Sequence, residues 1–227
     1  MATVLAFDVY GTLIDTHGVV TELEARLGRV GKGALAVEFS RRWRDKQLEY
    51  SFRRGLMGAY VPFGQCTREA LDFIDRALQA QLSDVDKDHL MTVYARLPAF
   101  PEASMALSRL AEAGIRCVAF SNGTFDAVSE LLVQAGLREL FEAVISVDEV
   151  KRFKPDPAVY AHLRNRLDVA SGDTWLISSN PFDVIGARHA GLHAAWVRRS
   201  LDAPFDPWGI EPDLTVTDLE ALADRLG

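Results

Sequence analysis

Short apolar segments recur along the chain and alternate with stretches that have helical periodicity. These segments are rich in β-branched and aromatic residues and span 4–9, 116–122, 143–147, 174–179 and 193–198, with 214–217 as a weaker candidate. Continuous apolar character is typical of strands that are buried on both faces of a parallel sheet. The order of strands and helices therefore predicts an α/β fold: a doubly wound, mostly parallel sheet with a Rossmann-like core.

Several helix boundaries in the second half of the chain are marked by residues that start or stop helices. A glycine after a helical pattern predicts a C′ position, and a polar residue before proline predicts an N-cap followed by the first helical residue. These signals are Gly114 after residues 105–113, Gly136 after 127–135, Asp156-Pro157 and Asn180-Pro181.

The connection between the first two predicted strands is much longer than the rest. A βαβ unit needs roughly 30 residues, whereas more than a hundred separate Asp8 from Ser121. The excess has helical patterns at about 17–28, 36–57, 67–81 and 84–96, with Thr67 and Ser83 as expected N-caps. We therefore expect a helical cap domain of residues 16–98, inserted into a core domain of residues 1–15 and 99–227.

Polar residues follow the predicted strands at the ends where ligands bind in open α/β sheets. They are Asp8, Tyr10 and Thr12 after the first strand, Ser121 and Asn122 after the second, Lys154 after the third, and Ser178, Asn180 and Asp183 after the fourth. Tyr160 falls in the first turn of the helix after Lys154, and helical side chains tilt toward the N-terminus, so it is expected to face Lys154.

Each of these residues, taken alone, also fits an ordinary structural role. Asp8 and Thr12 suit a turn, and Asn180 suits an N-cap that Asp183 supports from the third helical position. A single lysine such as Lys154 is most often solvated. Their combination at consecutive strand ends of one sheet favours a functional site.

Composition narrows the class of protein. The 227 residues are 48% hydrophobic and 25% charged, as in a globular protein with a sizeable core, and the net charge of −7 argues against a nucleic-acid partner. We expect neither a signal peptide nor a membrane span. The two cysteines form no metal or redox motif and the five histidines have no ligand spacing, so we expect a cytoplasmic protein without a metal site.

Four segments resemble the four motifs of the haloacid dehalogenase superfamily: FDVYGTL, FSNG, FKPDPAVY and SSNPFD. Their order and spacing cover the whole predicted core. A fifth segment, WRDKQLEYSFRRGLMGAYVPF at 43–63, is similar to the cap of the L-2-haloacid dehalogenases. The resemblance implies a hydrolase of short 2-haloacids.

The chain departs from the pattern of the superfamily's phosphatases. Those enzymes use a second aspartate two residues after the nucleophile and hold Mg²⁺ with further carboxylates, whereas this chain has Tyr10 there and only Asp183 in the fourth motif. Two carboxylates make a poor Mg²⁺ site. Because halide leaves as a stable anion, no second acid is required, so we expect neither metal nor cofactor.

The resemblance implies a role for each residue of the site. Asp8 attacks C2 of an (S)-2-haloacid, an aspartyl ester forms, and water hydrolyses it to the (R)-2-hydroxyacid. Asp183 activates that water, Ser178 and Asn180 orient the reacting group, Thr12 bonds near Asp8, and Lys154, held by Tyr160, balances the charge. The residues implied to contact substrate or halide are Val9, Tyr10, Arg44, Leu48, Phe63, Ser121, Asn122 and Phe182.

Several of these residues, and the chain as a whole, also fit other roles. Arg44 lies among other charged residues and also fits a solvated helix surface, Leu48 and Phe63 also fit the cap's core, and Asp45 puts an acid where an amide or apolar residue is expected. A phosphatase with a relaxed motif, or a binding protein on an inactive scaffold, would keep the same fold. The expected partners are a small 2-haloacid, a halide and a second copy of the chain, with no nucleic acid and no membrane.

Overall fold

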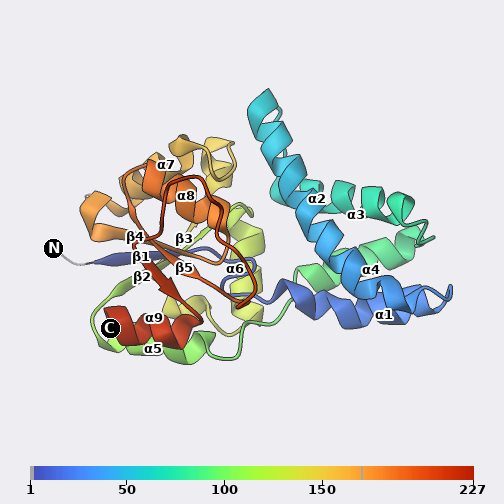
Figure 1. The fold of residues 1–227 in the computed structure, drawn as a ribbon, viewed down its shortest axis with the longest axis horizontal. Helices are drawn as coiled ribbons and strands as arrows, with labels where there is room; N and C mark the ends of the chain where they lie inside the picture. Colours follow the sequence, from blue (N-terminus) through green and yellow to red (C-terminus); the bar gives the residue numbers. More distant parts are fainter. Residues whose placement is uncertain (1–2, 170) are drawn as a thin grey trace. The chain divides into compact units, whose positions relative to one another are not determined.

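The structure is a computed structural model that describes residues 3–169 and 171–227. The chain divides into two compact units (Figure 1). The core unit runs to Ile14 and resumes at Ala99, and the inserted unit is Asp15–Pro98. The boundary thus falls one residue earlier than the sequence suggests.

The core unit contains a six-stranded parallel sheet with the order β3-β2-β1-β4-β5-β6. The predicted fold class is confirmed, and each of the six apolar segments contains a strand. The central strand β1 pairs with β2 on one side and with β4 on the other, so the strand order reverses there and ligands are expected beyond its carboxyl end. The strands are β1 (Val4–Phe7), β2 (Arg116–Ser121), β3 (Ala143–Ser146), β4 (Thr174–Ser178), β5 (His193–Val197) and β6 (Leu214–Val216).

Helices cover both faces of this sheet. In Figure 1, α7 and α8 lie on one face, and α5 and α9 lie together on the other. The core under α7 and α8 joins buried side chains of the strands, such as Phe120 and Leu176, to Leu163 and Val184 of these helices. The helices are α5 (Ala103–Glu112), α6 (Phe125–Gln134), α7 (Pro157–Leu167), α8 (Pro181–His189) and α9 (Leu219–Leu226), with 3-10 turns η3 (Arg138–Leu140), η4 (Val147–Val150) and η5 (Ser171–Asp173).

Most of the expected helix boundaries are confirmed. Gly114 and Gly136 have φ angles of 78° and 70°, the left-handed conformation of a C′ glycine. The Asp156 side chain accepts a hydrogen bond from the Ala158 amide at 2.8 Å and caps α7. Asn180 precedes α8 but makes no side-chain cap. Its amide group is used elsewhere, as described below.

The inserted unit is helical, as expected, with one wrong N-cap. Helix α3 begins at Phe63 after Pro62, and Thr67 lies buried inside it, with its hydroxyl donating to the Phe63 carbonyl at 3.0 Å. Ser83 does cap α4, in a reciprocal capping box with Asp86. The elements are η1 (Thr16–Val19), α1 (Val20–Gly28), η2 (Gly33–Leu35), α2 (Ala36–Met57), α3 (Phe63–Ala77) and α4 (Asp84–Tyr94).

The outgoing and returning segments at the unit boundary are paired with each other. Ile14 and Ala99 form an antiparallel bridge. The Phe100 amide donates to the Leu13 carbonyl at 2.9 Å, and the Asp15 amide donates to the Pro98 carbonyl at 2.9 Å. The two crossings therefore lie side by side.

Candidate active site

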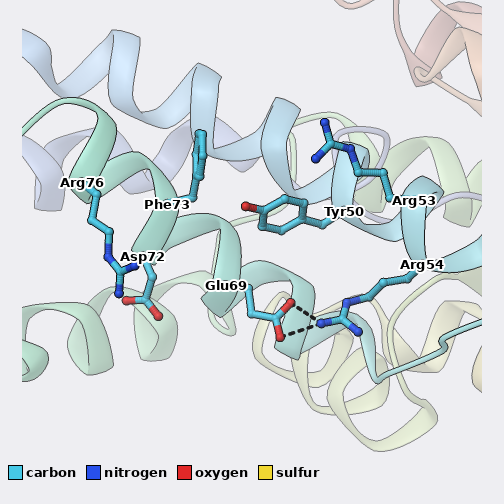
Figure 2. Close-up of a pocket in the computed structure, with 7 residues that line it drawn as sticks. All are labelled: Tyr50, Arg53, Arg54, Glu69, Asp72, Phe73 and Arg76. Atoms are coloured by element: carbon cyan, nitrogen blue, oxygen red, sulfur yellow. Dashed lines mark hydrogen bonds and ion pairs between the residues drawn. The ribbon is translucent and has the colours of Figure 1, made fainter. Parts of the chain in front are cut away.

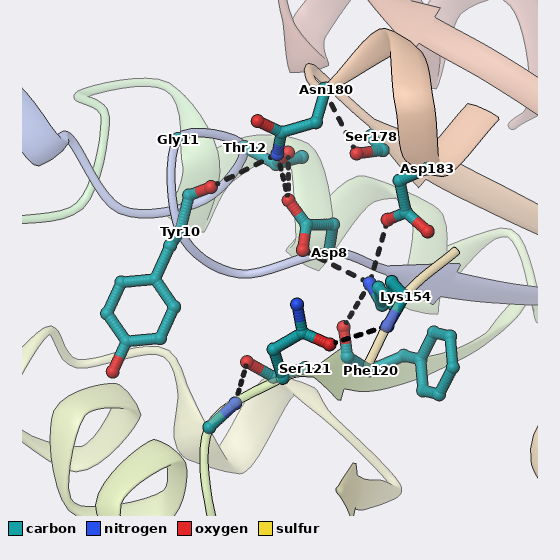
Figure 3. Close-up of polar contacts among 12 residues, drawn as sticks. Asp8, Tyr10, Gly11, Thr12, Phe120, Ser121, Lys154, Ser178, Asn180 and Asp183 are labelled. Atoms are coloured by element: carbon teal, nitrogen blue, oxygen red, sulfur yellow. Dashed lines mark hydrogen bonds and ion pairs between the residues drawn. The ribbon is translucent and has the colours of Figure 1, made fainter. Parts of the chain in front are cut away.

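Asp8 lies at the carboxyl end of the central strand, at the start of a tight turn. Its amide donates to the Ile177 carbonyl at 2.9 Å, which extends the pairing with β4 by one residue. Gly11 has a φ of +86°, a left-handed conformation that glycine adopts without strain. The chain then turns back, and the Thr12 hydroxyl donates to Oδ2 of Asp8 at 2.9 Å (Figure 3). The predicted contact between Thr12 and Asp8 is present.

Lys154 connects the two carboxylates of the site. Its Nζ lies 3.1 Å from Oδ1 of Asp8 and 2.7 Å from Oδ2 of Asp183 (Figure 3). A third hydrogen bond goes to the Phe120 carbonyl at 2.9 Å, so all three ammonium donors have acceptors. With an exposed fraction of 1%, this lysine is not the solvated residue that its sequence context alone allows.

The charges of this group depend on one another. Burial acts to lower the pKa of Lys154, but the carboxylates of Asp183 and Asp8 outweigh it and raise that pKa above its ordinary value. Burial raises the pKa of Asp183; the Lys154 ammonium opposes this shift without cancelling it. At neutral pH Lys154 is therefore an ammonium, and it lies between the side chains of Asp8 and Asp183.

Tyr160 contacts Asp183 rather than Lys154. Its hydroxyl donates to Oδ1 of Asp183 at 2.8 Å, and Oδ2 of the same carboxyl group binds Lys154, so the expected link from Tyr160 to Lys154 runs through Asp183. Gly186 makes this approach possible, because a Cβ at that position would lie 2.4 Å from the Tyr160 hydroxyl. Burial and the nearby Asp183 charge raise the pKa of Tyr160 well above 10.0, which keeps the phenol a donor.

Asn180 donates to Asp8 instead of capping its own helix. Its Nδ2 lies 2.7 Å from Oδ2 of Asp8 and 3.3 Å from the Tyr10 carbonyl (Figure 3). The Ser178 hydroxyl accepts from the backbone N–H of Asn180 at 3.1 Å. Oδ2 of Asp8 thus receives two neutral donors, from Thr12 and Asn180, while Oδ1 receives the ammonium of Lys154.

The last residue of β2 and the first residue after it are both polar and buried. The Ser121 hydroxyl accepts from the Gly123 amide at 3.1 Å. Oδ1 of Asn122 accepts from the Lys154 amide at 3.0 Å, so its side chain fixes the backbone that carries the lysine. The predicted contact of Ser121 and Asn122 with a substrate carboxylate stays a prediction.

The aromatic residues expected near the substrate lie at the rim of this group. Tyr10 and Phe182 are half-buried, and a Cβ placed on Gly123 would lie 3.5 Å from the Tyr10 ring. Val9 is fully buried, so its side chain belongs to the core and only its backbone is available to a ligand.

The remaining predicted residues lie in the inserted unit. Arg44 is half-buried on α2, and its guanidinium donates to Oε1 of Gln47 at 2.7 Å. The same oxygen accepts from the Tyr94 hydroxyl at 3.2 Å. Arg44 is therefore held by a neighbour on its own helix. Leu48 is half-buried and Phe63 is 3% exposed. Burial of this extent fits both a pocket wall and the core of the inserted unit.

A cavity of about 390 Å³ opens in the inserted unit (Figure 2). Its lining combines two aromatic residues with charged ones, and Arg54 binds Glu69 through two hydrogen bonds of 2.8 and 2.7 Å. None of the predicted site residues is among the lining residues, which are Tyr50, Arg53, Arg54, Glu69, Asp72, Phe73 and Arg76. The cavity holds no nucleophile beside a base, so we do not assign the chemistry to it.

The described residues contain neither a cluster that could bind a metal ion nor a cysteine that is a thiolate at neutral pH. Across residues 3–169 and 171–227, no group of three or more histidine, cysteine, aspartate or glutamate side chains could hold a metal ion. Burial raises the pKa of Cys66 to about 11 and that of Cys117 to about 12, so neither is a thiolate at neutral pH. Within the same described ranges, no helix is long and apolar enough to cross a membrane.

Two groups of the site were missed by sequence reasoning. Ser179 donates its amide to Oγ1 of Thr12 at 2.8 Å and its hydroxyl to the Gly11 carbonyl at 2.8 Å. Its place between Ser178 and Asn180 was the available signal. The Phe120 carbonyl, which accepts from Lys154, is a backbone group and has no sequence signature.

Comparison with known proteins places the chain in a family. A sequence model of haloacid dehalogenase-like hydrolases matches residues 2–191. The chain is 36% identical over 222 residues to (S)-2-haloacid dehalogenase 2 of Pseudomonas sp. strain CBS-3, covering 98% of this chain and 94% of that protein. It is 35% identical to haloacetate dehalogenase H-2 of Moraxella sp. strain B, covering 96% of this chain and 95% of that protein.

A solved structure shows the same fold. The L-2-haloacid dehalogenase from Xanthobacter autotrophicus, with chloropropionic acid covalently bound, has a TM-score of 0.89 and 33% identity, covering 99% of this chain and 98% of that one. The resemblance drawn from the motifs is thereby confirmed. Sequence and structure agree over nearly the whole length, and the chain belongs to the haloacid dehalogenase-like hydrolase family.

Proposed function

We propose that this protein is an (S)-2-haloacid dehalogenase, which hydrolyses short (S)-2-haloacids to (R)-2-hydroxyacids and halide without a metal. The names of its relatives support the substrate class. The observation that carries the proposal is the position of Lys154, whose ammonium bridges Asp8 and Asp183. That ammonium supplies a fixed positive charge between the two carboxyl groups.

In the first step, Asp8 is the nucleophile and Oδ1 attacks C2 of the substrate. The C2–halide bond breaks as the C2–O bond forms, and the halide leaves with both bonding electrons. Thr12 and Asn180 hold Oδ2 at 2.9 and 2.7 Å, which limits rotation of the carboxylate and presents the other oxygen. Attack opposite the halide inverts C2.

In the second step, Asp183 takes a proton from water and the water oxygen adds to Cγ of Asp8. The developing negative charge falls on Oδ2, where the hydroxyl of Thr12 and the amide of Asn180 already point. Donors that are positioned before the reaction stabilise such an oxyanion without reorganisation. Collapse of this intermediate releases the hydroxyacid, which receives the proton, and C2 keeps its inverted configuration.

Substrate recognition is proposed from the resemblance and the chemistry of the residues. Ser121 and the Asn122 backbone amide would bind the substrate carboxylate, and Arg44 would receive the halide as a fixed cation. Tyr10, Leu48, Phe63 and Phe182 would form apolar walls around the C2 substituent. Ser178 would orient Asn180, to which it is already bonded.

We further propose a homodimer in the cytoplasm. Leu56 and Met57 at the end of α2 are 91% and 77% exposed, and an apolar helix end favours contact with a second copy. Cys66 and Cys117 are both free thiols, which favours a reducing compartment. Light scattering after size-exclusion chromatography would test the dimer, with Leu56→Glu expected to shift it toward monomer.

One assay tests the activity. Halide release is measured from each enantiomer of 2-chloropropionate, with and without EDTA, and the configuration of the lactate is determined. We expect turnover of the (S) enantiomer only, (R)-lactate as product and no effect of EDTA. Activity that is lost in EDTA and restored by Mg²⁺, together with turnover of phosphate esters, would instead support a phosphatase. Formation of (S)-lactate from the (S) substrate would exclude a single inversion at C2.

A further inference from the structure

Three segments of the core unit meet at one arginine beyond the end of β5. Arg199 donates from Nη2 to the carbonyl oxygen of Thr12 and pairs through Nη1 with Oε1 of Glu102. Its guanidinium carbon lies 3.7 Å from the centre of the Phe100 ring. The side chains of Arg199 and Glu102 are each 17% exposed, so the ion pair is largely shielded from water.

These contacts attach both ends of the paired boundary segments to the sheet. Thr12 lies just before the outgoing crossing at Ile14, and Phe100 and Glu102 follow the returning crossing at Ala99. Glu102 also stands at the N-cap position of α5. Arg199 therefore holds the outgoing segment by a backbone carbonyl and the returning segment by a carboxylate and a ring.

Thr12 links this arginine to the nucleophile. Its carbonyl accepts from Arg199, while its hydroxyl donates to Oδ2 of Asp8 at 2.9 Å. The Ser179 amide donates to the same hydroxyl oxygen at 2.8 Å, and of the two acceptors of that hydroxyl, Oδ2 of Asp8 at 2.9 Å is nearer than Oγ of Ser179 at 3.2 Å. A shift of the Thr12 backbone would therefore loosen one of the two neutral donors on Oδ2.

An arginine suits this position better than a lysine. The planar guanidinium can pair with a carboxylate, donate to a carbonyl and stack on an aromatic ring at the same time, because its donors point in fixed directions within one plane. A lysine ammonium has no plane to stack and would hold one of these acceptors at the expense of the others.

We propose that Arg199 is a positioning residue for ester formation. It holds the backbone of Thr12, and Thr12 fixes the carboxylate of Asp8. The inference rests on the proposed role of Asp8 as nucleophile. Arg199 itself touches no reacting atom, and its effect passes through the Thr12 backbone to the orientation of the Asp8 carboxylate.

The experiment is a double-mutant cycle on the first chemical step. Rapid-quench single turnovers with excess enzyme and (S)-2-chloropropionate give the rate at which the ester adduct appears on the peptide that carries Asp8. Arg199→Met should slow that rate about tenfold, as expected for a misplaced reacting group, while KM changes less than twofold. In a Thr12→Val background the same substitution should change the rate less than twofold, because its route is already removed.

Arg198→Met is the matched control. Arg198 is the neighbouring residue, but its guanidinium binds the carbonyls of Ala203 and Leu201, away from Thr12. It should leave the adduct rate within twofold of wild type. Thermal unfolding is followed for every variant, and Arg199→Lys replaces Arg199→Met in the cycle if the latter is unfolded at the assay temperature.

The outcomes separate the two proposals. Independent, multiplying effects of the Arg199 and Thr12 substitutions, or an Arg199 variant as fast as the Arg198 control, would overturn the positioning role while leaving Asp8 as nucleophile. An adduct on a different peptide, or none in Asp183→Asn while substrate is consumed, would instead reject Asp8 as nucleophile.

Discussion

Lys154 and Asp183 form a buried ion pair in which Nζ lies 2.7 Å from Oδ2. The exposed fractions are 1% for the lysine side chain and 0% for the aspartate side chain. Removing a charge from water is costly, and such a pair persists only because each partner and its hydrogen bonds offset that cost. The pair therefore has consequences for stability as well as for catalysis.

Replacing Lys154 should destabilise the fold as well as stop turnover. Lys154→Met leaves Asp183 and Asp8 buried without their shared cation, and breaking a buried pair in this way costs about 3–5 kcal/mol. The free energy of unfolding is measured by urea titration. Lys151→Met is the control, because Lys151 is 60% exposed in its pair with Asp148 and a surface pair is worth about 0–1 kcal/mol. Equal losses in both variants would contradict a special role of the buried pair.

Activity should not fall between pH 8 and about 10. The pKa of Lys154 is raised above 10.5 and that of Tyr160 is raised well above 10.0. Both groups therefore keep their protons throughout that range. The stabilisation by the protonated lysine is fully present below pH 10.5 and is lost only as the pH rises through the raised value. If kcat/KM falls on the alkaline side to half its maximum already below pH 9, this assignment is contradicted.

The acid side should be governed by Asp183. Its pKa is raised from 3.8, chiefly by burial, and the proposed base must be ionised to accept a proton from water. The rate of ester hydrolysis should therefore be lost as the pH falls through a value above 3.8. Single turnovers that follow this second step measure that rate. The same pH profile is measured for Asp183→Asn. If its residual activity falls at the same acid pH as in wild type, another group is responsible.

Isotope labelling should locate the oxygen that enters the product. In a single turnover in ¹⁸O-water, the hydroxyacid should carry an oxygen from Asp8, so the label should enter the Asp8 peptide and the first product should be unlabelled. Asp183→Asn should slow ester hydrolysis more than ester formation, and the ester should accumulate as a mass adduct. Label in the first product with none on that peptide would mean that water attacks carbon directly.

Arg44→Ala should reduce halide release by at least about 100-fold without unfolding the protein, since the departing anion would lose its fixed cation. Arg41→Ala is the control, because Arg41 is an exposed residue on the same helix and should change the rate by no more than about twofold. Similar rates in the two variants would show that Arg44 is a structural residue bonded to Gln47.

The fold was readable from the sequence because its strong signals are local. Buried parallel strands appear as short apolar runs, and Gly114, Gly136 and Asp156 end or begin helices through their own backbone or side-chain preferences. The Thr67 N-cap was wrong for a tertiary reason. Residues 63–66 extend the helix, with Phe63 and Cys66 buried, so hydrophobic burial outweighed the capping preference of the threonine.

The site was only partly readable, because the sequence shows which residues reach a sheet edge but not which partner each one chooses. Asn180 had a capping alternative, and its amide instead serves Asp8. Tyr160 lies on the expected helix yet reaches Asp183, since Gly186 leaves room for it. Such choices depend on distances across the sheet that no spacing along the chain encodes.

The pairing of Leu13 with Phe100 and of Ile14 with Ala99 makes the ends of the inserted unit neighbours in space. A segment whose ends already meet contributes little constraint from its length, because the entropy of closing a loop grows only slowly as the loop gets longer. The core unit can therefore accept inserts of very different size at this point without a change in its own strands. The residues 15–98 are in this sense an interchangeable module, and a short turn between Ile14 and Ala99 would preserve the register of the chain on both sides.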